Sequence, residues 1–558
     1  MHIYPYPAGR HDFLRLKRET CLQCGVGQGS INSMSKNSGS VKAEHQQATA
    51  GLVQAVIFMG ASSVSMMVAE EHEDELRVLD VLSQPLALAE DIFRNGSISR
   101  ETMDRCVQIV LGFNNLLQEY RRAGDVPVRL LATNVLLNVN NMDSITNRLH
   151  TACGLSMEVL DDGEMARLLY INTQDMLDQH AELEKQRVLV LHVGPGNTRL
   201  LLFDRGRITY YAGYRMGAHR TAMSIRDTHF SSPGHECSVI REQIRGVVEQ
   251  ILHDSEGAIP TEPDALIIFG PDFTHIESPL LDEYSVGIET LEQLVEEIST
   301  TPHARRMSRY HVDYASVNAL LPAAVTYQTL AGAFEPHSIL LPHEEYAHAF
   351  LRSLLPTRKD AHGLDREVIH FAQLLANRYK IDRGHSQQVR KLCTALFDQL
   401  QELHGLTRHD RLLLNVAAVL HEIGTFISPK NHHRHGQYII LNSEIFGLSR
   451  PDVEVIGLLA RYHRHGAPTN KDSSYAELDL PNRLRVQKLA ALLRVADAME
   501  GAHSHRINQF TTRLNGRRLE LLVPGVHDLT IENIVMTKKA DLFTDIFGYD
   551  VRLLPAED

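Results

Sequence analysis

The sequence predicts a multidomain α/β protein whose later part is all-helical and whose end is a small α+β unit. The chain has 558 residues, which is too many for a single hydrophobic core, so several folded units are expected. Strand-like and helix-like patterns alternate from Leu52 to about residue 355, as is typical of α/β domains. From Leu364 onward, apolar residues recur at helical spacing, and strand patterns return only after residue 505.

Composition excludes several classes of protein. Hydrophobic residues make up 43% and charged residues 22%, which is ordinary for a globular protein. The net charge of -13 gives no electrostatic reason to bind duplex nucleic acid or an anionic membrane, so any anionic ligand needs a local basic pocket. Six cysteines with a single close pair predict no disulfide framework. We therefore expect a cytoplasmic protein with neither nucleic-acid duplex nor membrane as a partner.

Residues 1–48 are predicted to form a disordered tail. They are rich in Gly, Ser, Asn, Gln and His, and they have no apolar period that could build a core. Cys21 and Cys24 form a lone CxxC pair, which we interpret as two free thiols, with zinc as the less favoured alternative. Met34 is an alternative start, because nothing before it resembles a structural element.

Residues 49–180 predict the first α/β unit. It opens with two apolar strand-like runs separated by a small-residue turn at 60–63. A third strand follows, and then a long helix that begins after Arg100 and runs to residue 122, in which apolar residues recur at intervals of three and four. The remaining segments alternate strand and helix, and they are 128–133, 138–153, 155–160 and 163–177.

Residues 181–355 predict a second unit similar to the first. Residues 188–217 supply a pair of strands around a glycine-rich turn, and 265–276 supply another strand and turn. The repeated order of strand, turn and strand implies two similar halves.

Residues 364–505 predict an all-helical domain, and residues 506–558 a small α+β unit. Five segments show helical apolar spacing, and they are 366–380, 385–405, 408–427, 452–466 and 480–503. In the last unit, Asn515 and Gly516 predict a hairpin turn between two strands, followed by a helix and a final strand.

Several strings occur in an order that resembles the exopolyphosphatase and guanosine pentaphosphate phosphohydrolase family. In the first two units the strings are VIFMGASSVSMMV, LLATNVLLNVNN, GEMARLLY, VLHVGPGNTRLLLF and YRMGAHR, and in the helical domain they are LHEIGTFIS, HHRHGQYIILNSEIFG and LARYHRHGAP. The resemblance implies two actin/hexokinase-like (ribonuclease H-like) lobes followed by an HD-type helical domain. It also implies a homodimer that acts on polyphosphate or a guanosine polyphosphate.

The two glycine-rich turns are candidate phosphate-binding loops, because glycine lets backbone N–H groups approach phosphate oxygens. The candidates are Gly60, Ser62, Ser63, Gly194, Gly196, Asn197, Thr198 and Arg199. Pro195 removes one backbone donor from the second loop. Arg199 and His192 leave binding of an anion without hydrolysis open, beside a purely structural role.

The resemblance implies acidic residues in a cleft between the two α/β units, and this chain has other residues at those positions. The family has carboxylates where this chain has Phe58, Met165, His192 and Arg199, and an arginine where it has Leu137. Phenylalanine cannot hold a divalent cation and methionine cannot accept a proton, so the family mechanism is expected to be absent here. Glu164 is the remaining candidate base, although its helix position is turned about 100° from Met165.

The helical domain carries the candidate metal site. The resemblance to HD-type domains implies an early His, an adjacent His and acid, and a late Asp, and the matching residues are His385, His421, Glu422 and Asp497. Four further histidines are candidates for a second metal site or for a phosphate-facing patch with Arg461 and Arg464, and they are His432, His433, His435 and His463. Imidazole and carboxylate ligands suit Mn²⁺, Fe²⁺ or Zn²⁺ better than Mg²⁺.

Two functions follow from these patterns. The first is a phosphohydrolase whose chemistry takes place at the metal site of the helical domain, with His421 and Glu422 as catalytic residues. The second is a non-catalytic protein that binds a phosphorylated metabolite or regulates a partner. The alternative to a metal site is a set of hydrogen-bonded interior histidines.

Overall fold

The computed structural model describes residues 52–558 except 73–74, 123, 181, 231, 272–275, 277–279, 281–284, 342–344, 356–360, 465 and 557–558. The predicted tail at 1–48, with Cys21, Cys24 and Met34, lies outside the described residues. No helix in the described part of the chain combines the length and the apolar character needed to cross a bilayer.

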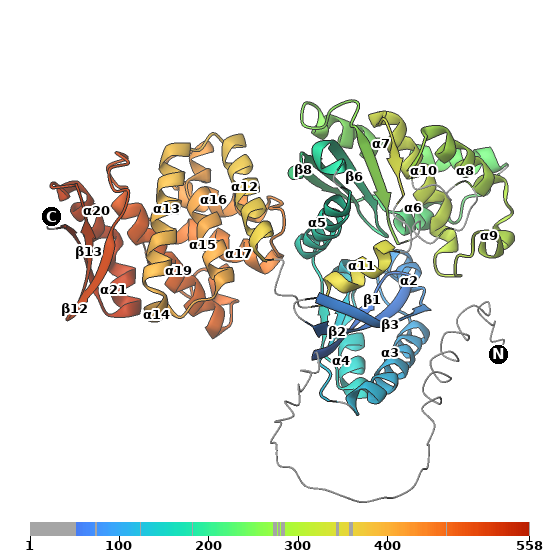
Figure 1. Ribbon diagram of the computed structural model, residues 1–558, viewed down its shortest axis with the longest axis horizontal. Coiled ribbons are helices and arrows are strands. Elements are labelled where there is room, and N and C mark those ends of the chain that lie inside the picture. The colour runs from blue at the N-terminus through green and yellow to red at the C-terminus, as the bar shows by residue number, and fades with distance from the viewer. Residues whose placement is uncertain are drawn as a thin grey trace, which may run out of the picture. The chain divides into compact units, whose positions relative to one another are not determined.

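The first sheet joins an antiparallel meander to two parallel strands. Its strands are β1 (Leu52–Met59), β2 (Ser63–His72), β3 (Glu75–Pro85), β4 (Val128–Ala132) and β5 (Met157–Val159), in the order β3-β2-β1-β4-β5. The strands β1, β2 and β3 are labelled in Figure 1. Its helices are α2 (Leu88–Asn95), α3 (Arg100–Arg121), α4 (Met142–Cys153) and α5 (Asp162–Gln179). α3 begins where expected because the Ser99 hydroxyl accepts a hydrogen bond from the Thr102 N–H.

The second sheet repeats this scheme. Its strands are β6 (Arg187–Val193), β7 (Thr198–Asp204), β8 (Arg207–Tyr214), β9 (Ala265–Phe269), β10 (Ser285–Val286) and β11 (Ile339–Leu340). The order β10-β11-β9-β6-β7-β8 contains the same meander and parallel neighbours as the first sheet. Residues 188–217 form three strands, not the predicted two, because Arg205 and Gly206 both have positive φ and close a tight hairpin.

Helices join these strands and cover the second unit. They are α6 (Ala218–Ile225), α7 (Pro233–Ser255), α8 (Ile288–Thr300), α9 (His303–Tyr310) and α10 (Val317–Phe334). α11 (Glu345–Ser353) was predicted within the second unit, but it packs on α5, β2 and β3 of the first unit. α10 is apolar around most of its circumference and packs against α6, α7 and α8, so it forms the centre of this layer.

The helical domain is a bundle, as predicted (Figure 1). Its main helices are α12 (Ala361–Arg378), α13 (Arg383–Gln399), α15 (Arg408–Leu420), α16 (His432–Leu441), α17 (Arg450–Tyr462) and α19 (Leu480–Met499). Short turns at α14 (Gln401–His404), η4 (Ile423–Phe426) and α18 (Ser473–Ala476) connect them. α13, α15 and α19 pack against one another.

The last unit is a three-stranded sheet with two helices, where the sequence predicted one helix. Its elements are β12 (Thr511–Asn515), β13 (Arg518–Val523), α20 (Thr530–Lys539), α21 (Asp541–Phe547) and β14 (Asp550–Pro555). Asn515 pairs with Arg518, so the hairpin turn is Gly516-Arg517 and lies one residue later than predicted. Gly516 has a φ of 57°, which is why glycine is favoured there. α20 and α21 pack on α19.

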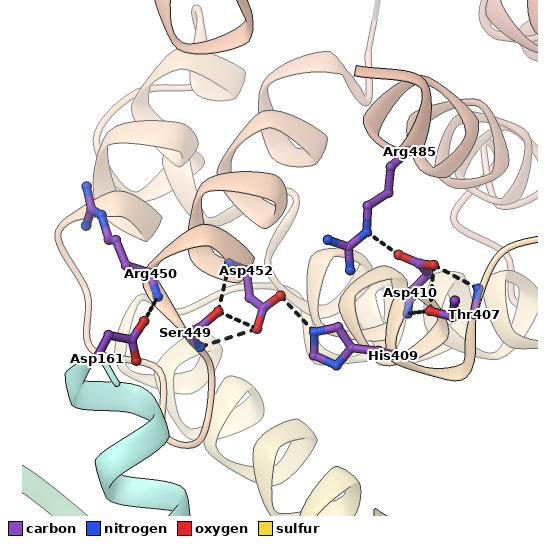
Figure 2. Close-up of polar contacts among 8 residues, drawn as sticks. All are labelled: Asp161, Thr407, His409, Asp410, Ser449, Arg450, Asp452 and Arg485. Atoms are coloured by element: carbon purple, nitrogen blue, oxygen red, sulfur yellow. Dashed lines mark hydrogen bonds and ion pairs between the residues drawn. The ribbon is translucent and has the colours of Figure 1, made fainter. Parts of the chain in front are cut away.

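The start of α5 docks on the start of α17 (Figure 2). The Asp161 carboxylate accepts a hydrogen bond from the Arg450 N–H. A Cβ on Gly163 would lie 1.8 Å from the Leu448 carbonyl oxygen, so only glycine permits this approach. Ser449 and Asp452 form a capping box that begins α17, and His409 Nε2 lies 2.7 Å from Asp452 Oδ1. These contacts fix α17, which ends next to His463.

Candidate functional site

The two glycine-rich turns use their own backbone donors internally. The Gly60 N–H donates to the Ser63 carbonyl at 2.8 Å, and the Gly194 N–H donates to the Asn197 carbonyl at 2.9 Å. The Thr198 hydroxyl donates to the Met216 carbonyl at 2.6 Å. Three donors that were predicted to bind phosphate are therefore already paired within the protein.

Residues 217–220 pack closely on the second turn. A Cβ on Gly217 would lie 2.5 Å from the Gly196 nitrogen. Arg220 Nε donates to the Gly196 carbonyl at 3.0 Å, and its guanidinium lies 4.9 Å from the centre of the Phe93 ring. The turn is thus held by neighbouring segments of the protein.

Phe58 and Met165 lie in an apolar cluster. Met165 is buried with Leu168 in this cluster, and Phe58 packs against its edge. The Phe58 ring meets Phe350 of α11 edge-on, with 5.1 Å between ring centres. Two positions at which the resemblance implies acids therefore make hydrophobic contacts here.

Glu164 completes the capping box of α5. Its Oε2 accepts a hydrogen bond from the Asp161 N–H at 2.8 Å, and its own N–H donates to Asp161 Oδ1 at 2.9 Å. Burial raises the pKa of the Glu164 carboxyl. The structure thus gives this carboxylate a helix-capping contact, and its catalytic role stays a prediction.

Arg199 is buried, and its charge is neutralised locally. The side chain is 3% exposed, and its guanidinium pairs with Asp162. Asp162 Oδ1 also accepts from Asn134 Nδ2 at 2.8 Å and from Asn197 Nδ2 at 3.1 Å. Burial and the nearby Asp162 raise the pKa of Glu444, whereas Arg199 lowers it. Sequence reasoning missed Asp162 and Glu444, because neither lies in the glycine-rich loops.

His192 is held neutral. The residue is 5% exposed, and burial, helped by the charge of Arg199, lowers its pKa to about 3. A neutral imidazole cannot attract an anion by charge, so this part of the predicted anion site lacks its electrostatic basis.

We expect His192 to make the protein sensitive to acid. Its pKa is about 3 in the folded state and roughly 6.5 in the unfolded state. Between these values only the unfolded chain binds the proton, so stability falls as the pH drops below ~6.5, by about 2 kcal/mol at roughly pH 5. Urea unfolding of wild type and His192→Leu, compared at about pH 7.5 and pH 5, should show the smaller loss in the variant. Equal losses would contradict the assignment.

The predicted metal ligands of the helical domain come together. Ligand atoms of His385, His421 and Glu422 all lie within 4.8 Å of one another. Asp497 Oδ1 lies 3.7 Å from His385 Nε2. His385 and His421 are 1% and 0% exposed, so the group is inside the domain. We call His385, His421, Glu422, His432, His463 and Asp497 the histidine cluster.

Three histidines of the cluster are fixed in the same tautomer. Each ring pairs its Nδ1 with the carbonyl three residues earlier, at 2.8 Å for His421, 2.6 Å for His463 and 3.0 Å for His432. A carbonyl only accepts, so the proton sits on Nδ1 and the Nε2 lone pair is left bare. This is the arrangement by which metal-binding histidines are oriented in proteins.

The bare nitrogens approach one another closely. His432 Nε2 and His463 Nε2 are 3.1 Å apart, and the His421 and His463 ring centres are 5.1 Å apart. Two lone pairs at that distance repel unless a proton or a metal ion lies between them. Two nitrogens that ligate one ion at about 2.1 Å lie roughly 3.0–3.4 Å apart, which matches this separation.

Other ring nitrogens of the cluster lack hydrogen bonds. Among the described residues, none reaches either nitrogen of His385 or Nε2 of His421. A buried polar atom left unpaired costs about 1–3 kcal/mol, so these nitrogens fit a metal ion better than a closed protein interior. Burial, with the nearby His421, lowers the pKa of His385 to about 4, which favours the neutral, ligating form.

Two residues at the cluster were not expected from sequence. The Lys539 ammonium at the end of α20 pairs with Asp497 Oδ2. The His503 ring stacks on His385, with 4.2 Å between ring centres. His503 lies in the AHSHR string directly after α19, so its position carried a usable signal. Lys539 comes from a different folding unit, and no local pattern indicates it.

Comparisons with known proteins agree with this architecture. The model of the Ppx/GppA phosphatase family matches residues 67–344, and that of Ppx/GppA phosphatase domain III matches residues 370–530. A guanosine-5'-triphosphate,3'-diphosphate pyrophosphatase of Aeromonas hydrophila is 23% identical over 427 residues, covering 73% of this chain and 79% of the relative. The protein of the same name from Vibrio vulnificus is 22% identical over 456 residues, covering 79% and 86%.

Solved structures of the same kind cover about half of the chain. An exopolyphosphatase from Cytophaga hutchinsonii has a TM-score of 0.46 at 16% identity, covering 54% of this chain and 98% of that one. A Ppx/GppA protein from Aquifex aeolicus has a TM-score of 0.41 at 15% identity, covering 53% and 96%. On the two family models, which match both the α/β part and the helical part, the chain belongs to the Ppx/GppA phosphatase family.

Proposed function

We propose that the chain is a metal-dependent phosphohydrolase whose reaction takes place at the histidine cluster of its helical domain. The observation that carries the proposal is the convergence of buried, bare imidazole nitrogens. His421, His432 and His463 each have Nδ1 committed to a backbone carbonyl, and His421 Nε2 lacks a hydrogen bond among the described residues. Such nitrogens are metal ligands that need no rearrangement.

Four of these residues suit a first divalent ion, and two suit a second. His385, His421, Glu422 and Asp497 offer imidazole nitrogen and carboxylate oxygen, a set that favours Mn²⁺, Fe²⁺ or Zn²⁺ over Mg²⁺. When bound, a divalent ion supplies Lewis acidity toward a phosphoryl oxygen and an activated water. The carbonyl contacts of the Nδ1 atoms hold the rings in place, and burial keeps bulk water away from them.

We call the region of Phe58, Met165 and Arg199 the front cleft. It supports a reaction in the helical domain because it lacks the acids of the family. Phe58 and Met165 lie in an apolar cluster, and Arg199 is neutralised by Asp162. A cation site there would need hard oxygen ligands, which neither apolar side chain supplies. We therefore propose that the catalytic acids of this cleft are lost and that hydrolysis, with His421 and Glu422 as the catalytic pair, depends on the helical domain.

The family supports the substrate class that we propose. Two relatives are named for a pyrophosphatase acting on a guanosine phosphate, and a solved neighbour is an exopolyphosphatase. We propose a polyphosphate or a guanosine polyphosphate as substrate and a homodimer as the assembly. The substituted cleft favours a second candidate, a non-catalytic protein that binds a phosphorylated metabolite or regulates a partner.

Phosphate release by the purified full-length chain tests the proposal. Polyphosphate, guanosine polyphosphates and a simple phosphomonoester are offered with Mn²⁺ or with Mg²⁺ after chelator treatment. We expect release with Mn²⁺, a loss of at least about 100-fold in His385→Ala, and little change in Asn197→Ala at the front turn. Release that depends on Asn197 and not on His385 would place the reaction in the front cleft. Metal binding without release from any substrate would favour the non-catalytic function.

A further inference from the structure

The last unit of the chain contributes a cation to the histidine cluster. Lys539 ends α20, and its ammonium pairs with Asp497 Oδ2. The lysine side chain is 19% exposed, whereas Asp497 is 7% exposed. A second ion pair fixes the approach, because Asp541 at the start of α21 pairs with the fully buried Arg494 one turn before Asp497. Two ion pairs therefore hold the junction of α20 and α21 against α19.

Asp497 separates the ammonium from the imidazoles. Its Oδ1 faces His385 Nε2 at 3.7 Å, and its Oδ2 faces Lys539. Lys539 thus borders the Asp497 side of the cluster, and its own side chain is partly exposed.

The Lys539 ammonium repels a metal ion bound in the histidine cluster, and it attracts an anion. Glu422 and Asp497 supply at most two negative charges, whereas a divalent ion and the Lys539 ammonium supply three positive charges. The ammonium has three donors, and the contact with Asp497 uses one of them. The excess charge and the remaining donors match the oxygens of a phosphoryl group.

We propose that Lys539 binds the phosphoryl oxygens of the substrate, so that the C-terminal α+β unit completes the site formed by the histidine cluster. The inference rests on the proposed function and adds a residue and a folding unit to it. Lys539 then belongs to the substrate-binding part of the site, and its ion pair with Asp497 positions it when no anion is present.

Binding of inorganic phosphate to the full-length, Mn²⁺-loaded protein tests the inference. Isothermal titration measures Mn²⁺ affinity first and phosphate affinity second in wild type, Lys539→Gln, Lys539→Arg and Lys538→Gln. Lys538 is the matched control, because it neighbours Lys539 on α20 but is exposed. In Lys539→Gln we expect phosphate affinity to fall about tenfold or more and Mn²⁺ affinity to rise a few-fold. Lys539→Arg keeps the charge and should retain phosphate affinity within about threefold.

The expected fall in phosphate affinity and rise in Mn²⁺ affinity distinguish phosphate binding by Lys539 from a purely structural role. If Lys539 only holds α20 on α19, Lys539→Gln weakens Mn²⁺ and phosphate together and lowers the melting temperature, which overturns the inference. Unchanged phosphate affinity in Lys539→Gln, or an equal loss in Lys538→Gln, also overturns it. Wild type that binds no Mn²⁺ is a separate failure at the first titration, and it overturns the proposed function and the inference with it.

Discussion

Replacing His421 with alanine is expected to remove the bound metal. The ring is 0% exposed, its Nδ1 is committed to the Ala418 carbonyl, and its Nε2 has no hydrogen bond among the described residues. Losing the nitrogen that faces the other ligands should weaken Mn²⁺ binding by at least about 100-fold. Elemental analysis of the purified protein, and the shift of melting temperature on adding Mn²⁺, measure the effect. For wild type at 100 times its dissociation constant, the ion adds about 2.7 kcal/mol of stability.

His404→Ala is the matched control for this change. His404 lies in the same domain and is 1% exposed, but both of its ring nitrogens are paired. Nε2 lies 2.8 Å from the Phe397 carbonyl, and Nδ1 accepts from the Leu406 N–H at 2.9 Å. Its loss leaves two buried groups unpaired, so the metal-free His404 variant should melt below the metal-free His421 variant.

The two variants separate metal binding from general stability. His404→Ala should still gain stability from Mn²⁺, and His421→Ala should not. If both variants keep the metal, His421 is not a ligand and the location of the proposed reaction is wrong. If both lose it, the loss reflects unfolding of the domain and not a missing ligand.

The fold could be predicted where the spacing of apolar residues within a single segment showed whether it is a helix or a strand. The meander of the first sheet, the long α3 and the helical bundle all follow from the spacing of apolar residues within one segment. The strand at Arg207–Tyr214 was not separated from the strand before it, because a loop of only two residues, Arg205 and Gly206, joins them. The short β10 and β11 have two residues each, which is too little sequence to show a period.

The candidate site could be predicted where one family pattern names its residues. His385 lies on α13, Asp497 lies on α19, and the adjacent His421 and Glu422 follow α15, yet a known order of residue types pointed to all four. Lys539 and the pair of Asp162 with Arg199 could not be found in this way. Their contacts join segments 37 or more residues apart, and only packing of whole elements brings them together.

We expect Gly424→Ala to disturb the histidine cluster, although Gly424 is not one of its residues. A Cβ there would lie 1.9 Å from the His432 carbonyl oxygen and 2.3 Å from the Gly436 nitrogen. These are backbone atoms of α16, which cannot rotate aside, so α16 must move away from η4. We expect Gly424→Ala to lower the free energy of unfolding by about 3 kcal/mol. Urea unfolding of the metal-free protein measures this loss, and titration with Mn²⁺ should show weaker binding.

Gly436→Ala tests the same contact from the other side. A Cβ at Gly436 meets its nearest neighbours at 3.6 Å, an ordinary contact distance, and alanine favours the helical backbone of α16. Its stability should therefore change by less than about 1 kcal/mol, in either direction, and Mn²⁺ affinity should stay near that of wild type. Equal losses in the two variants would mean that any added methyl disturbs this region. Retained Mn²⁺ affinity in a destabilised Gly424→Ala would mean that the place of α16, and hence His432, is not needed to hold the ion.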